Sequence, residues 1–175
     1  MSLIDTDLEN LKTGSNFVFS ATRIDKLGAA EYTLASIVLD VSGSVDGFKA
    51  QLEQMVKTVI KSCQKSPRSD NLMLRLVKFS TDVKEFHGFK ELNKCKEADY
   101  DNTVQCYGST ALFAATLEAL EASLTYGERL TKQDFLVNSI VFVITDGDDN
   151  NSGGITPERI KSLIDSTKQG EKLES

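Results

Sequence analysis

Two uncharged runs, each followed at once by an aspartate-bearing turn, constrain the fold of this chain more than any other feature. Residues 35–39 lead directly into Asp40, and residues 139–144 lead through Thr145 into Asp146. Short uncharged runs bounded by polar turns are typical of strands that are buried on both faces of a parallel sheet. Because open α/β sheets bind their ligands at the carboxyl ends of such strands, we expect both aspartates at a binding edge.

The remaining periodicities predict alternating helices and strands. Apolar spacings of three and four predict helices at residues 48–65, 112–124 and 157–168, and strand-like patterns occupy residues 17–22, 72–79 and 83–86. Such alternation is typical of a layered α/β domain. We therefore expect an α/β, Rossmann-like, doubly wound fold with a mostly parallel sheet, one antiparallel edge strand, and helices on both faces.

Two segments between these elements carry weaker signals. The short polar turn at residues 80–82 predicts that the flanking strands form a hairpin whose second strand, 83–86, lies at a sheet edge. Residues 88–107 are rich in charged side chains and poor in apolar ones, which predicts a surface excursion with one short helix.

Capping residues mark the starts of two helices. Ser109 or Thr110 is a natural N-cap for the helix at 112–124. For the last helix, Thr156 is the expected cap, Pro157 takes the first helical position, and Glu158 lies near the positive end of the helix dipole.

Composition excludes several classes of partner. The chain has 175 residues, of which 40% are hydrophobic, and this suits one compact domain. With 20 Lys and Arg against 26 Asp and Glu, the net charge of -6 offers no basic stripe for phosphates, so nucleic acid is not expected as a partner. Residues 1–14 lack the features of a signal peptide, and no run reaches the roughly 18 apolar residues of a membrane span.

Cysteine usage indicates the cellular compartment. Cys63, Cys95 and Cys106 are an odd number without CxxC spacing, which fits reduced thiols in a cytoplasm better than a disulfide framework. A bridge between Cys95 and Cys106 is the alternative. We therefore expect a cytoplasmic protein with no membrane partner.

Five oxygen-bearing side chains are the candidate metal ligands: Asp40, Ser42, Ser44, Thr110 and Asp146. The chain turns at Gly43, so both serines can reach one point, and the threonine arrives from another loop. A hard cation such as Mg²⁺ takes about six oxygen ligands and keeps several waters. A site with few carboxylates leaves the cation open to a carboxylate from outside. The alternative is that these side chains are ordinary caps and turn residues without a metal.

The acidic loop after Asp146 raises the question of a calcium loop. Asp146, Asp148 and Asn150 occupy alternate positions, as in an EF-hand. However, Asn151 stands where that loop requires glycine, and Pro157 stands where it requires a bidentate glutamate. We therefore expect a solvated acidic loop beside the site.

The three segments together resemble the von Willebrand factor A domain and its metal-ion-dependent adhesion site (MIDAS). The pattern Asp-x-Ser-x-Ser is present as residues 40–44, a distant threonine as Thr110, and a later aspartate as Asp146 within Thr-Asp-Gly. The resemblance covers residues 34–168. It implies that the serines and the threonine coordinate directly, that the aspartates act largely through water, and that a partner protein's Asp or Glu completes the coordination of Mg²⁺, of Mn²⁺ or, as a further candidate, of Ca²⁺.

The resemblance also implies a domain division. Residues 1–33 are expected to form an N-terminal extension with an added strand, and residues 34–175 a vWA-like domain. Family members usually continue with a further strand and helix, and we expect this domain to lack them. Either the chain is truncated or its sheet is completed differently, and an exposed sheet edge would be open to pairing with another molecule.

The resemblance implies a non-enzymatic, metal-dependent protein-binding module. One alternative is a metal-assisted hydrolase, but the chain lacks a phosphate loop, a nucleophile elbow and a His-Glu-x-x-His motif. The single histidine, His87, is expected at the edge hairpin, far from the metal. A second alternative, also implied by the family, is a structural subunit of a larger assembly beside an ATPase. The oligomeric state is left open.

Overall fold

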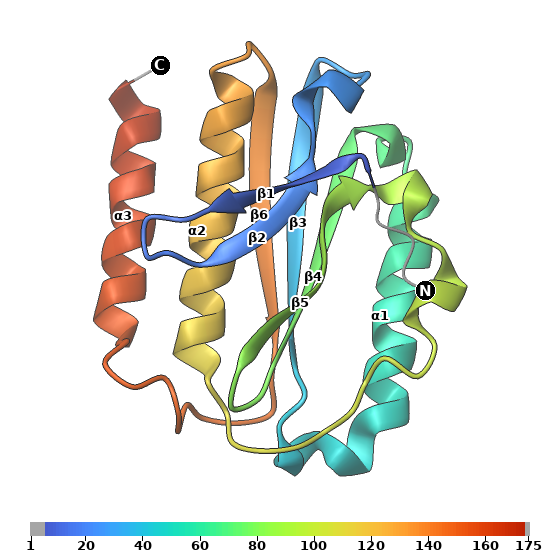
Figure 1. Cartoon of the computed structure of the whole chain (residues 1–175), viewed down its shortest axis with the longest axis vertical. Coiled ribbons are helices and arrows are strands. Elements are labelled where there is room, and N and C mark those ends of the chain that lie inside the picture. The colour runs from blue at the N-terminus through green and yellow to red at the C-terminus, as the bar shows by residue number, and fades with distance from the viewer. Residues whose placement is uncertain (1–5, 174–175) are drawn as a thin grey trace.

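A computed structural model, which describes residues 6–173, contains one six-stranded sheet and three α-helices (Figure 1). The strands are β1 (Leu8–Lys12), β2 (Val18–Thr22), β3 (Glu31–Asp40), β4 (Leu72–Phe79), β5 (Val83–Glu91) and β6 (Leu136–Ile144). The helices are α1 (Lys49–Gln64), α2 (Leu112–Thr131) and α3 (Pro157–Leu173). Five short 3₁₀ segments are η1 (Ile24–Lys26), η2 (Gly43–Phe48), η3 (Ser69–Asn71), η4 (Leu92–Lys94) and η5 (Glu97–Tyr100).

The predicted fold class is confirmed. The strand order is β1-β2-β5-β4-β3-β6, and β3 pairs in parallel with both β4 and β6. Helix α1 packs on one face of β3, against Ile37, and α2 packs on the other, against Leu34 and Val38. Helix α3 lies beside α2 (Figure 1). Every residue from 34 to 40 is buried, which explains why this part of the strand carries no charge before Asp40, whereas Glu31 at its start is exposed.

The position of β5 differs from the prediction. The hairpin of β4 and β5 forms as expected, but β5 is an inner strand, because β2 pairs with its far side and β1 with β2. The predicted strand at residues 17–22 is β2, so it extends this same sheet. The approach is close at Gly88, where any side chain would collide with the backbone of Ser20. The edge on this side is therefore β1.

The opposite edge of the sheet is β6. Within residues 6–173 it pairs only with β3. Ile140 and Phe142 are 45% and 50% exposed on this strand. The high apolar content of β6 is therefore only partly used in the core.

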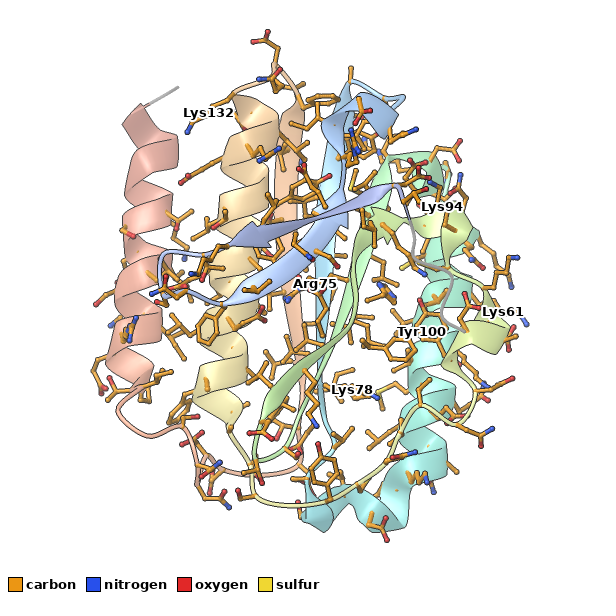
Figure 2. The ribbon with its side chains drawn as sticks, in the orientation of Figure 1. Lys61, Arg75, Lys78, Lys94, Tyr100 and Lys132 are labelled. Atoms are coloured by element: carbon orange, nitrogen blue, oxygen red, sulfur yellow. The ribbon has the colours of Figure 1, made fainter. Side chains whose placement is uncertain are left out.

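Residues 88–107 are not the predicted surface excursion. The first of them belong to β5, and the remainder folds as η4, η5 and a loop that cover the α1 face of the sheet. Leu92, Cys95, Tyr100 and Val104 are all buried in the core against α1, as Figure 2 shows for Tyr100. The charged side chains between them point outward, so average polarity concealed four inward positions.

Two further properties follow from the described residues. Cys63, Cys95 and Cys106 are all free thiols. Among the helices within residues 6–173, none is both long and apolar enough to span a bilayer.

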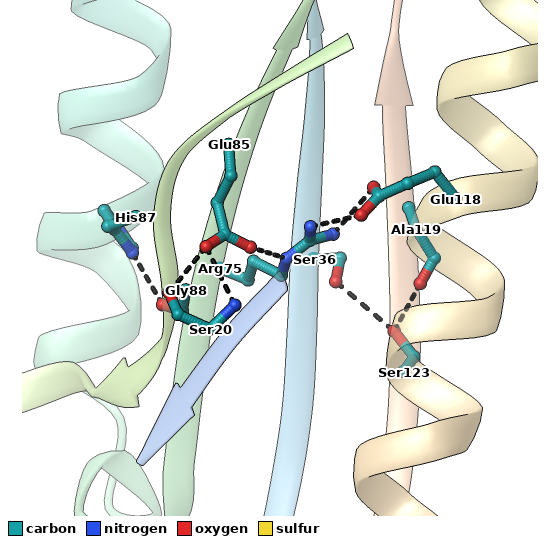
Figure 3. A network of polar contacts seen from close by, with 9 residues as sticks. All are labelled: Ser20, Ser36, Arg75, Glu85, His87, Gly88, Glu118, Ala119 and Ser123. Carbon is teal, nitrogen blue, oxygen red and sulfur yellow. Dashed lines mark hydrogen bonds and ion pairs between the residues drawn. The ribbon is translucent and has the colours of Figure 1, made fainter. Parts of the chain in front are cut away.

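A network of buried charged side chains joins three strands of the sheet to helix α2. Arg75 of β4 is completely buried, and its Nε donates to Oε2 of Glu85 over 2.7 Å (Figure 3). Its two terminal nitrogens both bond Glu118 of α2, with Nη1 to Oε2 at 3.0 Å. The remaining Glu85 oxygen accepts the backbone N–H of Ser20 in β2 over 2.9 Å. One guanidinium thus ties together β2, β4, β5 and α2.

We expect loss of Glu118 to be strongly destabilising. Glu118→Ala leaves the Arg75 guanidinium buried with half of its partners missing, which costs about 3–5 kcal/mol of unfolding free energy. Urea denaturation measures this. Glu128→Ala is the control, because Glu128 is exposed on the same helix and its loss should cost less than about 0.5 kcal/mol. A cost below about 1 kcal/mol for Glu118→Ala would show that the network contributes little.

Candidate metal site

The three predicted site segments meet at one end of the sheet, where the carboxyl ends of β3 and β6 lie; we call this end the carboxyl edge. Strands β3 and β6 run parallel in a register that pairs Leu39 with Ile144, so the residues that follow both strands emerge together. The segment before α2 joins them through its backbone: the N–H of Tyr107 donates to Val41 over 2.9 Å, and the N–H of Gly43 donates to Gly108 over 3.1 Å. The edge therefore collects all three segments.

Asp40 is held from two sides. Its side chain is completely buried, Oδ1 accepts the N–H of Ser42 over 2.8 Å, and Oδ2 accepts the hydroxyl of Thr145 over 2.7 Å. In the part of the chain that the structure describes, no Lys, Arg or His forms an ion pair with it. A buried carboxylate without a cationic partner is costly, which favours a bound cation nearby.

Ser42, Ser44 and Asp146 form a chain of oxygen atoms. The two serine hydroxyls are 3.1 Å apart, and the Ser44 hydroxyl donates to Oδ1 of Asp146 over 3.1 Å. Ligands at the 2.0–2.1 Å typical of Mg²⁺ lie about 3.0 Å apart along an octahedral edge. The observed spacing, which is that of hydrogen-bonded oxygens, is therefore also compatible with neighbouring ligands of a single small cation.

Thr110 reaches this edge but does not contact the other four predicted residues by a hydrogen bond. It is 6% exposed, and its backbone is bonded to Asn150 and Asn151. Among residues 6–173, its hydroxyl has no hydrogen-bond partner and remains available to a ligand. The structure thus links Asp40, Ser42, Ser44 and Asp146 through hydrogen bonds, and the backbone contacts of Thr110 bring it to the same end of the sheet.

The donor set fits a hard cation. It comprises two carboxylates and three hydroxyls, all of them oxygen ligands. Within the described ranges, no group of three or more His, Cys, Asp or Glu side chains could hold a metal. A cation at the five candidate residues would therefore be held by hydroxyls and water, as Mg²⁺ often is, rather than by a cage of carboxylates.

The start of α2 differs from the prediction. Neither Ser109 nor Thr110 caps the helix; Ala111 is at the N-cap position and has no side-chain cap. Instead, Asp149 accepts the N–H of Phe113 over 3.1 Å, and Ser152 accepts that of Ala114 over 2.9 Å. The Thr156 cap of α3 is confirmed by its hydrogen bond from the N–H of Arg159 over 3.4 Å.

Sequence reasoning therefore missed three residues around the site. Thr145 fixes Asp40, Asp149 caps α2, and Asn150 bonds Thr110. The available signal was position: Thr145 directly precedes Asp146, and the others follow within the same polar loop. Since Asp149 and Asn150 bond the start of α2, the loop is only partly the solvated acidic segment that we expected.

The family comparison covers most of the chain. A model described as von Willebrand factor type A domain matches residues 36–171. No curated protein matches the chain significantly in sequence.

Several solved structures share the fold. A von Willebrand factor type A protein from Catenulispora acidiphila matches with a TM-score of 0.55 and 16% identity, over 91% of this chain and 37% of that protein. PilB minor pilin from Streptococcus sanguinis gives 0.52 and 20%, over 75% and 33%. Proximal thread matrix protein 1 from the mussel byssus, with a zinc-occupied MIDAS motif, gives 0.52 and 21%, over 81% and 35%. The chain thus spans about a third of the length of these proteins, and at such identities the similarity shows the fold alone.

His87 is engaged elsewhere. It lies in β5, where Nε2 hydrogen-bonds the Tyr100 hydroxyl at 2.7 Å and Nδ1 lies 2.9 Å from the carbonyl of Gly88. Burial lowers the pKa of His87 to about 4, with a smaller contribution from Lys90 and Arg75. The imidazole is therefore neutral near pH 7 and is bound within the fold.

We expect the chain to lose stability as the pH falls from 7 to 5. A histidine in the unfolded chain takes up its proton near pH 6.5, whereas His87 in the folded chain does so near pH 4. Between these values the unfolded state binds more protons, so this group lowers the unfolding free energy by up to about 1.4 kcal/mol per pH unit. Urea denaturation at both pH values should show a weaker pH dependence for His87→Gln than for the wild type. If the wild type and His87→Gln showed the same pH dependence of stability, the lowered pKa of His87 in the folded chain would be contradicted.

Proposed function

The chain belongs to the von Willebrand factor type A domain family, and from that premise we propose that it is a protein-binding module that works through a bound divalent cation. The cation lies at the edge formed by Asp40, Ser42, Ser44, Thr110 and Asp146. An Asp or Glu side chain of a partner protein completes its coordination. Mg²⁺ is the expected cation, with Mn²⁺ and Ca²⁺ as further candidates.

The cluster around Ser42 and Ser44 is the observation that carries this proposal. Two hydroxyls and the Asp146 carboxylate lie at a spacing compatible with ligands, next to a buried Asp40 whose two oxygens are both fixed by hydrogen bonds. Caps and turns alone do not require this convergence, because Ser44 and Asp146 are 102 residues apart in the chain. The zinc-occupied MIDAS of the mussel byssus protein supports a cation at this fold edge without identifying it.

The donor set explains why the cation would bind an acidic partner. Hydroxyls carry no charge, and Asp40 is oriented by Ser42 and Thr145 so that it acts from behind the first layer of ligands. A divalent cation held in this way retains positive charge on its open side. Its strongest complement is a carboxylate from another molecule.

The alternatives are less well supported. A metal-assisted hydrolase needs a base near the cation, and the only histidine is neutral and bound to Tyr100 in the sheet. A structural role within a larger assembly would use the same fold, and a metal-dependence test separates it from recognition. The cytoplasmic location stays a prediction.

We expect Mn²⁺ to raise the melting temperature of the wild type by about 5–10 °C at 100 times its Kd, because it binds only the folded state. Asp146→Ala should abolish this rise, and Ser42→Ala and Thr110→Ala should reduce it. Asp148→Ala is the control, since this exposed side chain lies in the same loop outside the donor set, and it should keep most of the shift. A full shift in Asp146→Ala would remove Asp146 from the site.

Partner binding should depend on the same cation. The immobilised chain is expected to capture a protein from lysate of its native source in Mg²⁺ and to release it in chelator. The Asp146→Ala chain should capture none, while Asp148→Ala should behave like the wild type. Capture that is unaffected by chelator would support the structural role instead.

A further inference from the structure

The backbone of Thr110 is clamped by a dipeptide that lies 40 residues later in the chain. Its N–H donates to Oδ1 of Asn150 over 2.7 Å. Its carbonyl accepts two further hydrogen bonds, from the N–H of Asn150 at 3.0 Å and from that of Asn151 at 3.1 Å. All backbone hydrogen-bonding capacity of Thr110 is therefore used, and the hydroxyl is the one oxygen that this residue can offer to a cation.

The neighbours of Thr110 are fixed as well. The N–H of Ser109 donates to the Thr81 hydroxyl over 3.2 Å, and that of Ala111 donates to the Ser80 carbonyl over 2.8 Å. Gly108 has a φ of 73°, and a Cβ there would lie 2.3 Å from the Thr81 hydroxyl, so the approach requires glycine. The side-chain amide of Asn151 donates to the Thr81 carbonyl over 2.9 Å. The loop that bonds Thr110 and the turn that bonds its neighbours are therefore also bonded to each other.

From these contacts we infer that Asn150 is a positioning residue of the cation site, acting through the Thr110 backbone without touching the cation. This inference rests on the proposed function. The clamp follows Asp146 by only four residues, so one loop supplies a ligand and also orients the threonine from another segment. Cation binding and closure of the clamp are then linked: each stabilises the other by the same free energy.

The chain offers variants that separate positioning from helix capping. Asn150→Ala removes the acceptor for the Thr110 N–H, whereas Asn150→Asp retains an oxygen at that place. Ser152→Ala removes the acceptor for the N–H of Ala114, in the first turn of α2, and leaves the Thr110 contacts intact. A purely structural effect would appear in both alanine variants.

Calorimetric titration with Mn²⁺ measures the outcome. Asn150→Ala should weaken binding about tenfold, which corresponds to the loss of one hydrogen bond. Asn150→Asp should restore binding to at least a third of the wild-type affinity, and Ser152→Ala should lower the melting temperature while leaving the affinity within about threefold of wild type. Amide hydrogen exchange in metal-free buffer should be faster at Thr110 in Asn150→Ala only.

The possible failures are distinguishable. If the wild type binds Mn²⁺ and Asn150→Ala binds it equally well, the positioning role is wrong and the proposed function stands. If both alanine variants weaken binding to the same extent, the loop acts only through stability, and the positioning role is again contradicted. If the wild type does not bind Mn²⁺, both the proposed function and the positioning role fail, and the exchange experiment still reports whether the clamp exists.

Discussion

The buried guanidinium of Arg75 is the constraint on which the rest of the structure depends. An unpaired charge in that position would be strongly destabilising, and Glu85 and Glu118 pair with it from either side. Meeting that requirement fixes β5 and α2 relative to β4, and through Ser20 it also fixes β2. The same interaction holds α2, which begins directly after the Thr110 segment.

The candidate site follows from sheet geometry and electrostatics together. Parallel pairing of β3 with β6 brings Asp40 and Asp146 to the same end of the sheet, where Thr145 also bonds Asp40. The buried Asp40 then provides negative charge where solvent cannot screen it. Ser42, Ser44 and the Thr110 hydroxyl supply neutral oxygens around it. In the proposed function, this combination would attract a cation and leave it incompletely neutralised, which is the property that recognition of an acidic partner requires.

Local and periodic features were predictable, whereas contacts between distant residues were not. The strand at 17–22, the buried runs before the two aspartates and the Thr156 cap follow from neighbouring residues alone. The caps of α2 could not be found in this way, because Asp149 and Ser152 lie 36 and 38 residues along the chain from the backbone N–H groups whose hydrogen bonds they accept. Likewise, β5 was expected at an edge because no local pattern shows that β2 pairs beside it. For the site, the motif named five residues whose segments the structure brings together, and their role as metal ligands stays a prediction.

An anomalous difference map from a crystal soaked in Mn²⁺ tests the central claim most directly. The account predicts one peak at the carboxyl edge of the sheet, about 2.1–2.3 Å from the hydroxyls of Ser42, Ser44 and Thr110, with Asp40 and Asp146 reaching it directly or through water. A map with no peak there, or with the ion held by other residues, would contradict the account.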